Sequence, residues 1–258
     1  MIKKKDANEK KQQIIKRFRE NVRGKIANTA NSNFRHDGKE GHWLERQMGI
    51  KANNKTESDL FGYEMKKDAT KITFGDWSAD YYLYKESNYL DKEMFIKIFG
   101  KKNLLKNRWS WSGEPVPKIN KWNDFGQKLV VDKERNIKAL YSFHNDKRPD
   151  KSKIVPKNLQ TSEIPIAIWK SMSLEKRIES KFGQNGWFIC MKDEKGVYNE
   201  IGFGDPITFD DWIKLVLEGK IYFDSAMRFD KAKPNSRNYS QWRASGIVWH
   251  SLITESYK

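Results

Sequence analysis

The chain has 258 residues, in which 50 Lys and Arg against 34 Asp and Glu give a formal net charge of +16 and a pI near 9.6. Hydrophobic residues make up 37% and include 10 Trp, 14 Phe and 10 Tyr, so the chain can bury a core and wholesale disorder is excluded. A mean hydropathy of −0.88 leaves no apolar run of about 18 residues, which excludes a membrane span, and the single Cys190 excludes an internal disulfide.

The N-terminal part of the chain carries helix and strand patterns in turn. Apolar residues at helical spacing, among them Ile14, Phe18 and Val22, predict a basic helix within residues 1–30. A short helix over His42–Met48 is expected to end at Gly49, because a left-handed residue commonly closes a helix. The other elements expected here are strands over 59–66 and 70–77, an amphipathic helix near Lys92–Phe99, and a long ordered loop over Asn107–Asn123.

The second half of the chain continues this mixture after a polar stretch. The segment Asn145–Asn158 is charged and holds two prolines, which predicts a connection between two lobes, residues 1–150 and 151–258. Beyond it we expect a helix near Leu174–Phe182, a hairpin from Gly186–Met191 to Val197–Phe203, a helix over Phe209–Leu217 and a strand over Lys220–Arg228. Helices and strands mixed in this way predict an α/β or α+β fold.

The positive charge is spread along the chain rather than confined to a tail. A folded body of this kind attracts polyanions, and nucleic acid is the first candidate because cationic side chains displace counterions from phosphates. A role of the charge in solubility alone is the alternative. No basic helix has an apolar face wide enough for membrane-surface binding. The basic N-terminus lacks the apolar stretch of a secretory signal, so we expect a cytoplasmic protein.

The stretch TESDLFGYEMKK, residues 56–67, holds the residues with the clearest chemistry: Asp59, Glu64 and Lys66. Side chains alternate along a strand, so Glu64 and Lys66 are expected on one side. Asp59 is out of phase with them, and a bend before Gly62 would turn its carboxylate towards Glu64. Two carboxylates can hold Mg²⁺, and a lysine beside the ion can orient or deprotonate a water. This set is sufficient for phosphodiester hydrolysis.

The spacing acid-x-Lys has little value alone in so lysine-rich a chain, since it recurs, for instance, in Glu9–Lys11 and Glu179–Lys181. Only the pair Glu64–Lys66 has an Asp five residues before its acid. The alternative interpretation of the three residues is an ordinary salt-bridged strand.

A further carboxylate, Glu45, lies in the expected short helix, fourteen residues before Asp59. With it, the segment GHWLERQMGIKANNKTESDLFGYEMK resembles the core of the MutH-like nucleases of the PD-(D/E)xK superfamily. Within them it is most similar to the MvaI/BcnI family of restriction endonucleases. The resemblance implies Glu45 as an accessory acid, Asp59 and Glu64 as metal ligands, and Lys66 as the base that positions water.

The resemblance also implies an architecture. It predicts a restriction-endonuclease-like mixed central sheet flanked by helices, with two lobes around a DNA-binding cleft. Residues 1–150 would form the catalytic lobe, with the nuclease core at about 40–105, and residues 151–258 the DNA-recognition lobe.

The expected helix Phe209–Leu217 and the segments GKIYFDSAMRFD and SRNYSQWRASG that follow it resemble the recognition lobe of the family, whose strands and loops place side chains in the DNA grooves. Arg pairs bidentately with guanine and Asn with adenine. The family commonly has a His after the Arg-Asn pair, where this chain has Tyr239. Phosphate contact without base readout is therefore the alternative. The candidate DNA-binding residues are Arg228, Arg237, Asn238 and Arg243.

The function implied is that of a type II restriction endonuclease that uses Mg²⁺ and leaves 5′-phosphate ends on double-stranded DNA. The family further implies a monomer, a target of the CC-N-GG type and a DNA methyltransferase as genetic partner in a prokaryote. The motif GxxxxGK[ST] is absent, so ATP use is not expected. Two alternatives remain: a MutH-like mismatch-repair nicking enzyme, and a non-catalytic basic nucleic-acid-binding protein.

Overall fold

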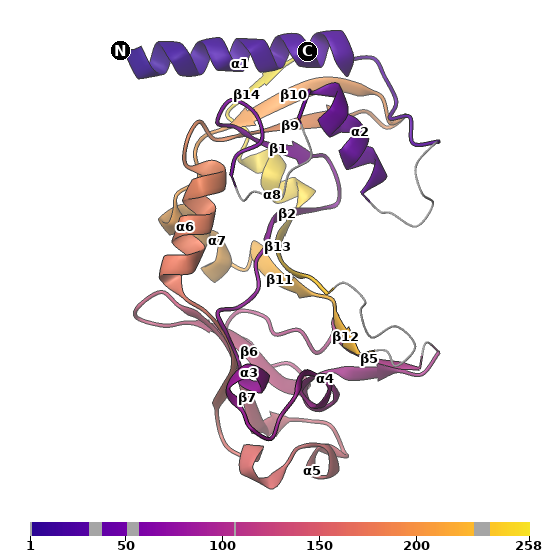
Figure 1. Ribbon diagram of the computed structural model, residues 1–258, viewed down its shortest axis with the longest axis vertical. Coiled ribbons are helices and arrows are strands. Elements are labelled where there is room, and N and C mark those ends of the chain that lie inside the picture. The colour runs from indigo at the N-terminus through magenta and orange to yellow at the C-terminus, as the bar shows by residue number, and fades with distance from the viewer. Residues whose placement is uncertain (1, 31–37, 51–56, 106, 230–237) are drawn as a thin grey trace. The chain divides into compact units, whose positions relative to one another are not determined.

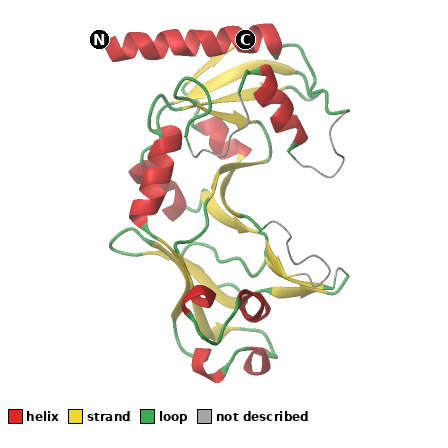
Figure 2. Ribbon diagram, viewed as in Figure 1, coloured by secondary structure: helices red, strands yellow, loops and turns green. Residues whose placement is uncertain are grey.

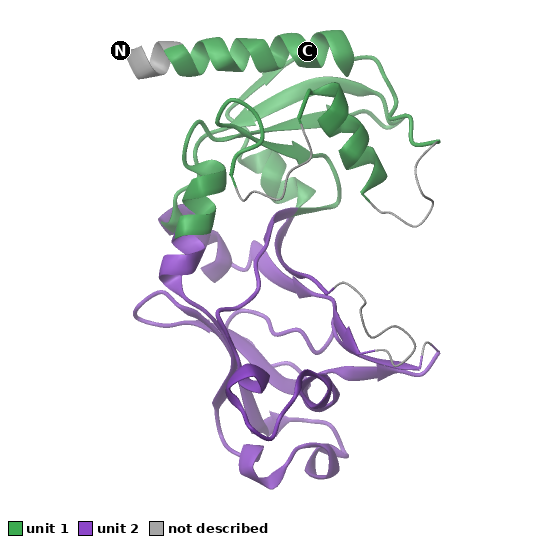
Figure 3. Cartoon of the chain, in the orientation of Figure 1, with its two compact units in different colours: residues 1–72, 176–209, 245–258 green, residues 73–175, 210–244 purple. Residues whose placement is uncertain are grey.

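The computed structural model of the protein describes residues 2–30, 38–50, 57–105, 107–229 and 238–258 (Figure 1). The chain divides into two compact units, each built from separated stretches of sequence (Figure 3). Unit 1 contains residues 1–72, 176–209 and 245–258, and unit 2 contains residues 73–175 and 210–244. Within the described residues, no helix is long and apolar enough to cross a membrane.

The predicted lobes are contiguous in sequence, whereas the observed units are not. The polar segment 145–158, expected to join two lobes, lies entirely within unit 2. It contains the end of a strand, a short helix α5 (Lys151–Ile154) and a 3-10 turn (Lys157–Leu159). The assignment of catalysis to residues 1–150 and of recognition to residues 151–258 stays a prediction.

Unit 1 is built on a mixed sheet with strand order β1-β9-β10-β14 (Figures 1 and 2). Its strands are β1 (Glu64–Lys67), β9 (Trp187–Lys192), β10 (Tyr198–Gly204) and β14 (Glu255–Tyr257). Strand β1 runs parallel to β9, and the other neighbours are antiparallel. The expected hairpin of β9 and β10 and the expected mixed α+β fold are confirmed.

One face of this sheet packs against helices α1 (Ile2–Asn21) and α2 (Lys39–Gln47). The apolar side of α1 is buried, as its spacing predicts, and Gly49 follows α2 with φ +73°. The opposite face meets the end of α6 (Ser171–Phe182) and α8 (Gly246–Ser251) through rings of Phe182, Trp187 and Trp249. The core of the first face consists of Ile14, Ile15, Phe18, Val22, Trp43, Leu44, Met48, Ile50, Leu60, Tyr63, Met65, Phe188, Cys190, Tyr198, Ile201 and Phe203.

Unit 2 contains most of the remaining strands, arranged in further sheets with strand orders β3-β8-β7-β6, β11-β13-β2 and β12-β5-β4. The strands are β2 (Lys71–Asp76), β3 (Tyr81–Tyr82), β4 (Lys101–Asn103), β5 (Arg108–Trp111), β6 (Phe125–Val131), β7 (Ile137–Asp146), β8 (Ile164–Trp169), β11 (Ile221–Ser225), β12 (Met227–Phe229) and β13 (Ser240–Ser245). The helices are α3 (Leu83–Glu86), α4 (Lys92–Phe99), α5 and α7 (Phe209–Leu217). Its core is aromatic: Trp169 and Phe223 contact each other and both contact Trp242.

The expected helices over Lys92–Phe99 and Phe209–Leu217 have the observed bounds. The expected loop over Asn107–Asn123 is wrong at its start, because residues 108–111 form β5 and pair with both β4 and β12. Strands β6, β7 and β8 lie in the part of the chain for which the sequence patterns indicated no element.

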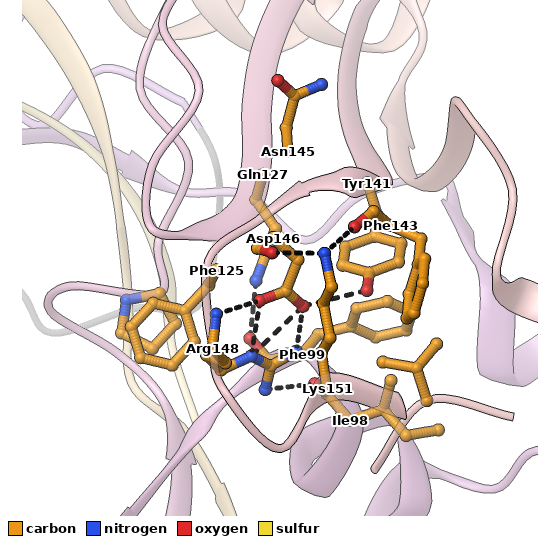
Figure 4. A network of polar contacts seen from close by, with 12 residues as sticks. Ile98, Phe99, Phe125, Gln127, Tyr141, Phe143, Asn145, Asp146, Arg148 and Lys151 are labelled. Carbon is orange, nitrogen blue, oxygen red and sulfur yellow. Dashed lines mark hydrogen bonds and ion pairs between the residues drawn. The ribbon is translucent and has the colours of Figure 1, made fainter. Parts of the chain in front are cut away.

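The end of β7 in unit 2 is held by a buried ion pair (Figure 4). Asp146, fully buried, accepts hydrogen bonds from Arg148 Nη2 at 2.6 Å and from the hydroxyl of Tyr141 at 2.9 Å. Arg148 also donates to the carbonyl of Ile98 at 2.9 Å, and Lys151 donates to the carbonyl of Asp146 at 2.7 Å. The pair therefore ties β7 to both α4 and α5.

We expect Asp146→Ala to lower the free energy of unfolding by about 3–5 kcal/mol, since it leaves the largely buried Arg148 guanidinium without its counter-charge. Urea unfolding monitored by Trp fluorescence measures this change. The control is Lys147→Ala, which removes an ion pair to Asp124 whose side chains are both 76% exposed. It should cost less than about 1 kcal/mol. Equal effects of the two substitutions would contradict this account.

Candidate active site

The segment before β1 is a tight turn that places Asp59 beside the strand. Leu60 and Tyr63 exchange backbone hydrogen bonds of 3.0 and 2.9 Å. Between them Phe61 and Gly62 have φ values of +53° and +83°, as in a type I′ turn. The Oδ2 atom of Asp59 accepts the backbone N–H of Met65 at 2.9 Å. The bend expected before Gly62 is therefore present, and β1 begins at Glu64 rather than at Asp59.

Strand β1 sends its side chains to opposite faces of the sheet. Met65 packs into the core that α1 and α2 cover, whereas Glu64 and Lys66 lie on the other side and are 3% and 5% exposed. Lys66 Nζ is 2.9 Å from Glu64 Oε1. It also lies over the rings of Phe182 and Trp249, 5.0 and 5.5 Å from their centroids. The predicted pairing of Glu64 and Lys66 on one side is thus observed, in a strongly buried setting.

A second lysine reaches the same carboxylate from α6. Lys181 Nζ lies 2.6 Å from Glu64 Oε1, so two ammonium groups share one carboxylate oxygen. Sequence reasoning missed Lys181 as part of the site, because it lies 117 residues from Glu64. It arrives there because α6 leads into β9, the parallel neighbour of β1. That non-local pairing left no signal in the pattern around Lys181.

The other oxygen of the same carboxylate is unpaired within the described part of the chain. Glu64 Oε2 is buried and accepts no hydrogen bond from the described residues. Burial acts to raise the pKa of Glu64, but the charges of Lys66 and Lys181 outweigh it and hold the pKa below its ordinary value. An ionised, buried carboxylate with one unused oxygen fits a hard divalent cation such as Mg²⁺.

The neighbouring groups are shifted in the opposite sense. Burial, with the charge of Glu64 adding to it, raises the pKa of Asp59 to about 6. Burial lowers the pKa of Lys66, although the charge of Glu64 opposes the change. A carboxylic acid and an amine whose charged forms are both disfavoured are typical of sites that bind a metal or transfer a proton.

Glu45 lies on α2, which is fixed to the sheet by a separate set of ion pairs. Glu40, in the first turn of α2, contacts Lys67 of β1 at 3.0 Å and Lys192 of β9 at 2.6 Å. Glu45 itself is half-buried. Burial raises its pKa, and the charge of Glu64 adds to the effect while His42 opposes it. Glu45 is therefore within electrostatic reach of Glu64.

The carboxylates do not form a complete metal cage. Within the part of the chain that the structure describes, no group of three His, Cys, Asp or Glu side chains lies close enough to hold a metal ion. A cation held by Asp59 and Glu64 would need oxygen ligands from water or from a phosphate to complete its coordination. Such an incomplete protein ligand set is typical of Mg²⁺ sites that act on phosphates.

The candidate DNA-binding residues that the structure describes lie in unit 2. Asn238 Oδ1 accepts the backbone N–H of Arg228 at 2.7 Å, so the two are neighbours. Arg243 is paired with Asp224 at 3.2 Å and donates to Gln241. Arg237 lies outside the described residues. The ion pair with Asp224 orients the Arg243 guanidinium and was not foreseen from the sequence.

Substitution of Gly62 tests the role of the turn between Leu60 and Tyr63. Its Cα lies so close to the loop after α6 that a Cβ would come 2.7 Å from Asn185 Nδ2, which donates to the carbonyl of Phe61. We expect Gly62→Ala to cost about 2 kcal/mol of unfolding free energy and to displace Asp59. Gly113 has a similar φ of +69° with nothing within 4 Å, so Gly113→Ala should cost only about 1 kcal/mol. Chemical unfolding compares the two, and equal costs would contradict a role for the packing.

The comparisons with known proteins identify the family to which the chain belongs. A family model described as LlaMI restriction endonuclease matches residues 22–257. The type II restriction enzyme ScrFI of Lactococcus lactis subsp. cremoris is 43% identical over 274 residues, which cover 97% of this chain and all of ScrFI. The structure of a complex of the restriction endonuclease MvaI with cognate DNA shares the fold, with a TM-score of 0.60, 14% identity and 97% of each chain covered. The resemblance to restriction endonucleases is confirmed, and the chain belongs to the LlaMI restriction endonuclease family.

Proposed function

We propose that this protein hydrolyses phosphodiester bonds of double-stranded DNA at a short specific site, with Mg²⁺ as cofactor, and leaves 5′-phosphate and 3′-hydroxyl ends. The observation that carries the proposal is the buried Glu64 carboxylate. One of its oxygens is shared by Lys66 and Lys181, and the other has no partner among the described residues. Membership of a restriction endonuclease family supports DNA as the substrate.

Asp59 and Glu64 are proposed to hold the Mg²⁺. The bound ion supplies Lewis acidity towards the scissile phosphate and acidifies water. Glu64 is kept ionised for this purpose by Lys66 and Lys181. Asp59, with a pKa near 6, has to lose its proton before it can act as a ligand. Glu45 is proposed as the accessory acid at the edge of the site.

Lys66 is proposed to position the attacking water. Burial lowers the pKa of Lys66, so Nζ gives up its own proton more readily than an exposed lysine would, and it can then hold the water and accept its proton while the water oxygen attacks phosphorus. The bond from phosphorus to the 3′ oxygen then breaks, and the leaving oxygen takes a proton from solvent. The rings of Phe182 and Trp249 exclude water from the side of Lys66 that they cover.

Site recognition is proposed for unit 2, through Arg228, Arg237, Asn238 and Arg243. The net charge of +16 supports a basic, DNA-binding surface around the acidic site. The structure of MvaI that shares the fold is a complex with its cognate DNA substrate. We further propose that the protein acts as a monomer on a target of the CC-N-GG type. We also propose that it works in the cytoplasm of a prokaryote whose own DNA is protected by a cognate DNA methyltransferase.

Digestion of several unmethylated plasmids tests the function. With Mg²⁺ we expect discrete fragments whose mapped ends share one short sequence and carry 5′-phosphates, and with EDTA we expect intact DNA. Plasmid that stays intact with Mg²⁺ and also with Mn²⁺ would contradict the proposal. Nicked circles that form only after a partner protein is added would instead indicate a repair-type nickase.

A further inference from the structure

The sheet β12-β5-β4 in unit 2 has one apolar and one polar face. Helix α4 packs on the apolar face, where the rings of Phe95 and Trp111 meet with their centroids 5.4 Å apart. Met227 of β12 is the register partner of Trp111 and is buried with it. Because side chains alternate along each strand, the neighbours of these residues point away from α4.

The face opposite α4 is basic. Arg228 pairs in register with Ser110, and Lys101 pairs with the same Ser110 from the other side. Arg108 precedes Ser110 by two residues and so lies on the same face. The three strands contain no acidic residue, and three of their four basic residues, Lys101, Arg108 and Arg228, lie on this face, whereas Lys102 pairs in register with Trp109 on the other. Of the cations on this face, Lys101 has an ion pair to Glu114 at 3.2 Å, in the loop beyond β5.

Arg108 differs from other arginines of unit 2 in its partners. Arg148 is bound to Asp146 and Arg243 to Asp224. The Nε atom of Arg108 is buried and has no hydrogen-bond partner within the described part of the chain. A buried N–H without an acceptor disfavours the folded state, so such groups commonly mark a place where an external acceptor binds.

We propose that this basic face contacts duplex DNA and that Arg108, beside Arg228, donates hydrogen bonds to it. The proposal rests on the proposed function and extends it to a residue on β5, outside the segment expected to read DNA. Charge complementarity selects the occupant, because a half-buried guanidinium on a face whose strands carry no acidic residue matches the acceptor oxygens of DNA. Those oxygens belong either to phosphates or to the edge of a guanine.

Binding of labelled duplexes in EDTA, measured by fluorescence anisotropy, tests the proposal. One duplex carries the mapped cleavage site and the other has that site scrambled. We expect Arg108→Met, which keeps an apolar stem, to bind the site duplex about tenfold or more weakly than the wild type. The matched control is Arg135→Ala, which removes one exposed guanidinium of the same unit, paired with Asp210. It should change binding much less.

The two duplexes distinguish the two acceptors. If Arg108 contacts a phosphate, Arg108→Met weakens binding to both duplexes. The slope of the logarithm of the binding constant against the logarithm of the salt concentration then becomes shallower by about one. If it contacts a guanine edge, only the site duplex loses affinity. A thermal melt confirms that each variant is folded, and Arg108→Lys replaces Arg108→Met if the latter is not.

Wild-type affinity and discrimination in a folded Arg108 variant would overturn the proposal. The same holds for a loss no greater than that of Arg135→Ala. In either case a wild type that still cleaves its site leaves the proposed function standing. A wild type that neither binds nor cleaves any duplex contradicts the proposed function itself.

Discussion

Replacing Lys66 by methionine is expected to slow plasmid cleavage by about a thousandfold or more while leaving the protein folded. Methionine fills the volume between Phe182 and Trp249 that the lysine stem occupies, so no cavity forms. It removes the amine that we propose to hold and deprotonate the attacking water. Single-turnover cleavage at saturating Mg²⁺ measures the effect on chemistry alone.

Two further lysine variants sharpen this experiment. Lys71→Met removes an exposed lysine five residues along the chain and should cleave at the wild-type rate. Lys181→Met removes one of the two charges that lower the pKa of Glu64, so that pKa rises. The acidic limb of its pH–rate profile should therefore move to higher pH. A Lys66→Met variant that keeps more than about a tenth of the wild-type rate would contradict the role of Lys66.

The parts of the site that are local in sequence could be predicted from it. Glu64 and Lys66 lie two residues apart on a strand, so simple alternation places them together. The turn at Gly62 is also local, because Phe61 and Gly62 alone supply its left-handed conformations. Trp43 and Leu44 are buried as expected, and they bring Glu45 to the sheet. The strand alternation and the turn each depend on fewer than about ten residues of chain.

The parts that depend on sheet pairing could not be predicted. Lys181 reaches Glu64 only because β1 pairs in parallel with β9. Glu40 similarly contacts Lys192 across 152 residues. The sequence predicts a loop at Arg108, because β5 is short and gains its strand character from β4 and β12. Local patterns carry no information on such partners, and the same holds for the division of the chain into interleaved units.

Asp59→Asn is expected to stabilise the protein and to inactivate it at the same time. The pKa of Asp59 is near 6 in the folded state against an ordinary 3.8, so the folded state holds this proton more tightly than the unfolded state. The contribution of Asp59 to the unfolding free energy therefore falls as pH rises from about 4 to 6, and stays low above pH 6. Asparagine has no charge to bury and can still accept the N–H of Met65.

The expected gain of Asp59→Asn at pH 8 is about 1–3 kcal/mol, and it should shrink as the pH is lowered below 6. Urea unfolding at pH 5 and pH 8 measures it, with Asp205→Asn, an exposed carboxylate of the same unit, as the control for lost charge. Mg²⁺ should stabilise the wild type, because we propose that the ion binds the ionised Asp59, and should stabilise Asp59→Asn far less. Equal stability of the two proteins at pH 8 would show that the ionised Asp59 has no energetic cost in the folded state. Equal stabilisation of both proteins by Mg²⁺ would show that Asp59 is not a metal ligand. The predicted outcome instead explains why an ionisable group is retained where a neutral one would fold better.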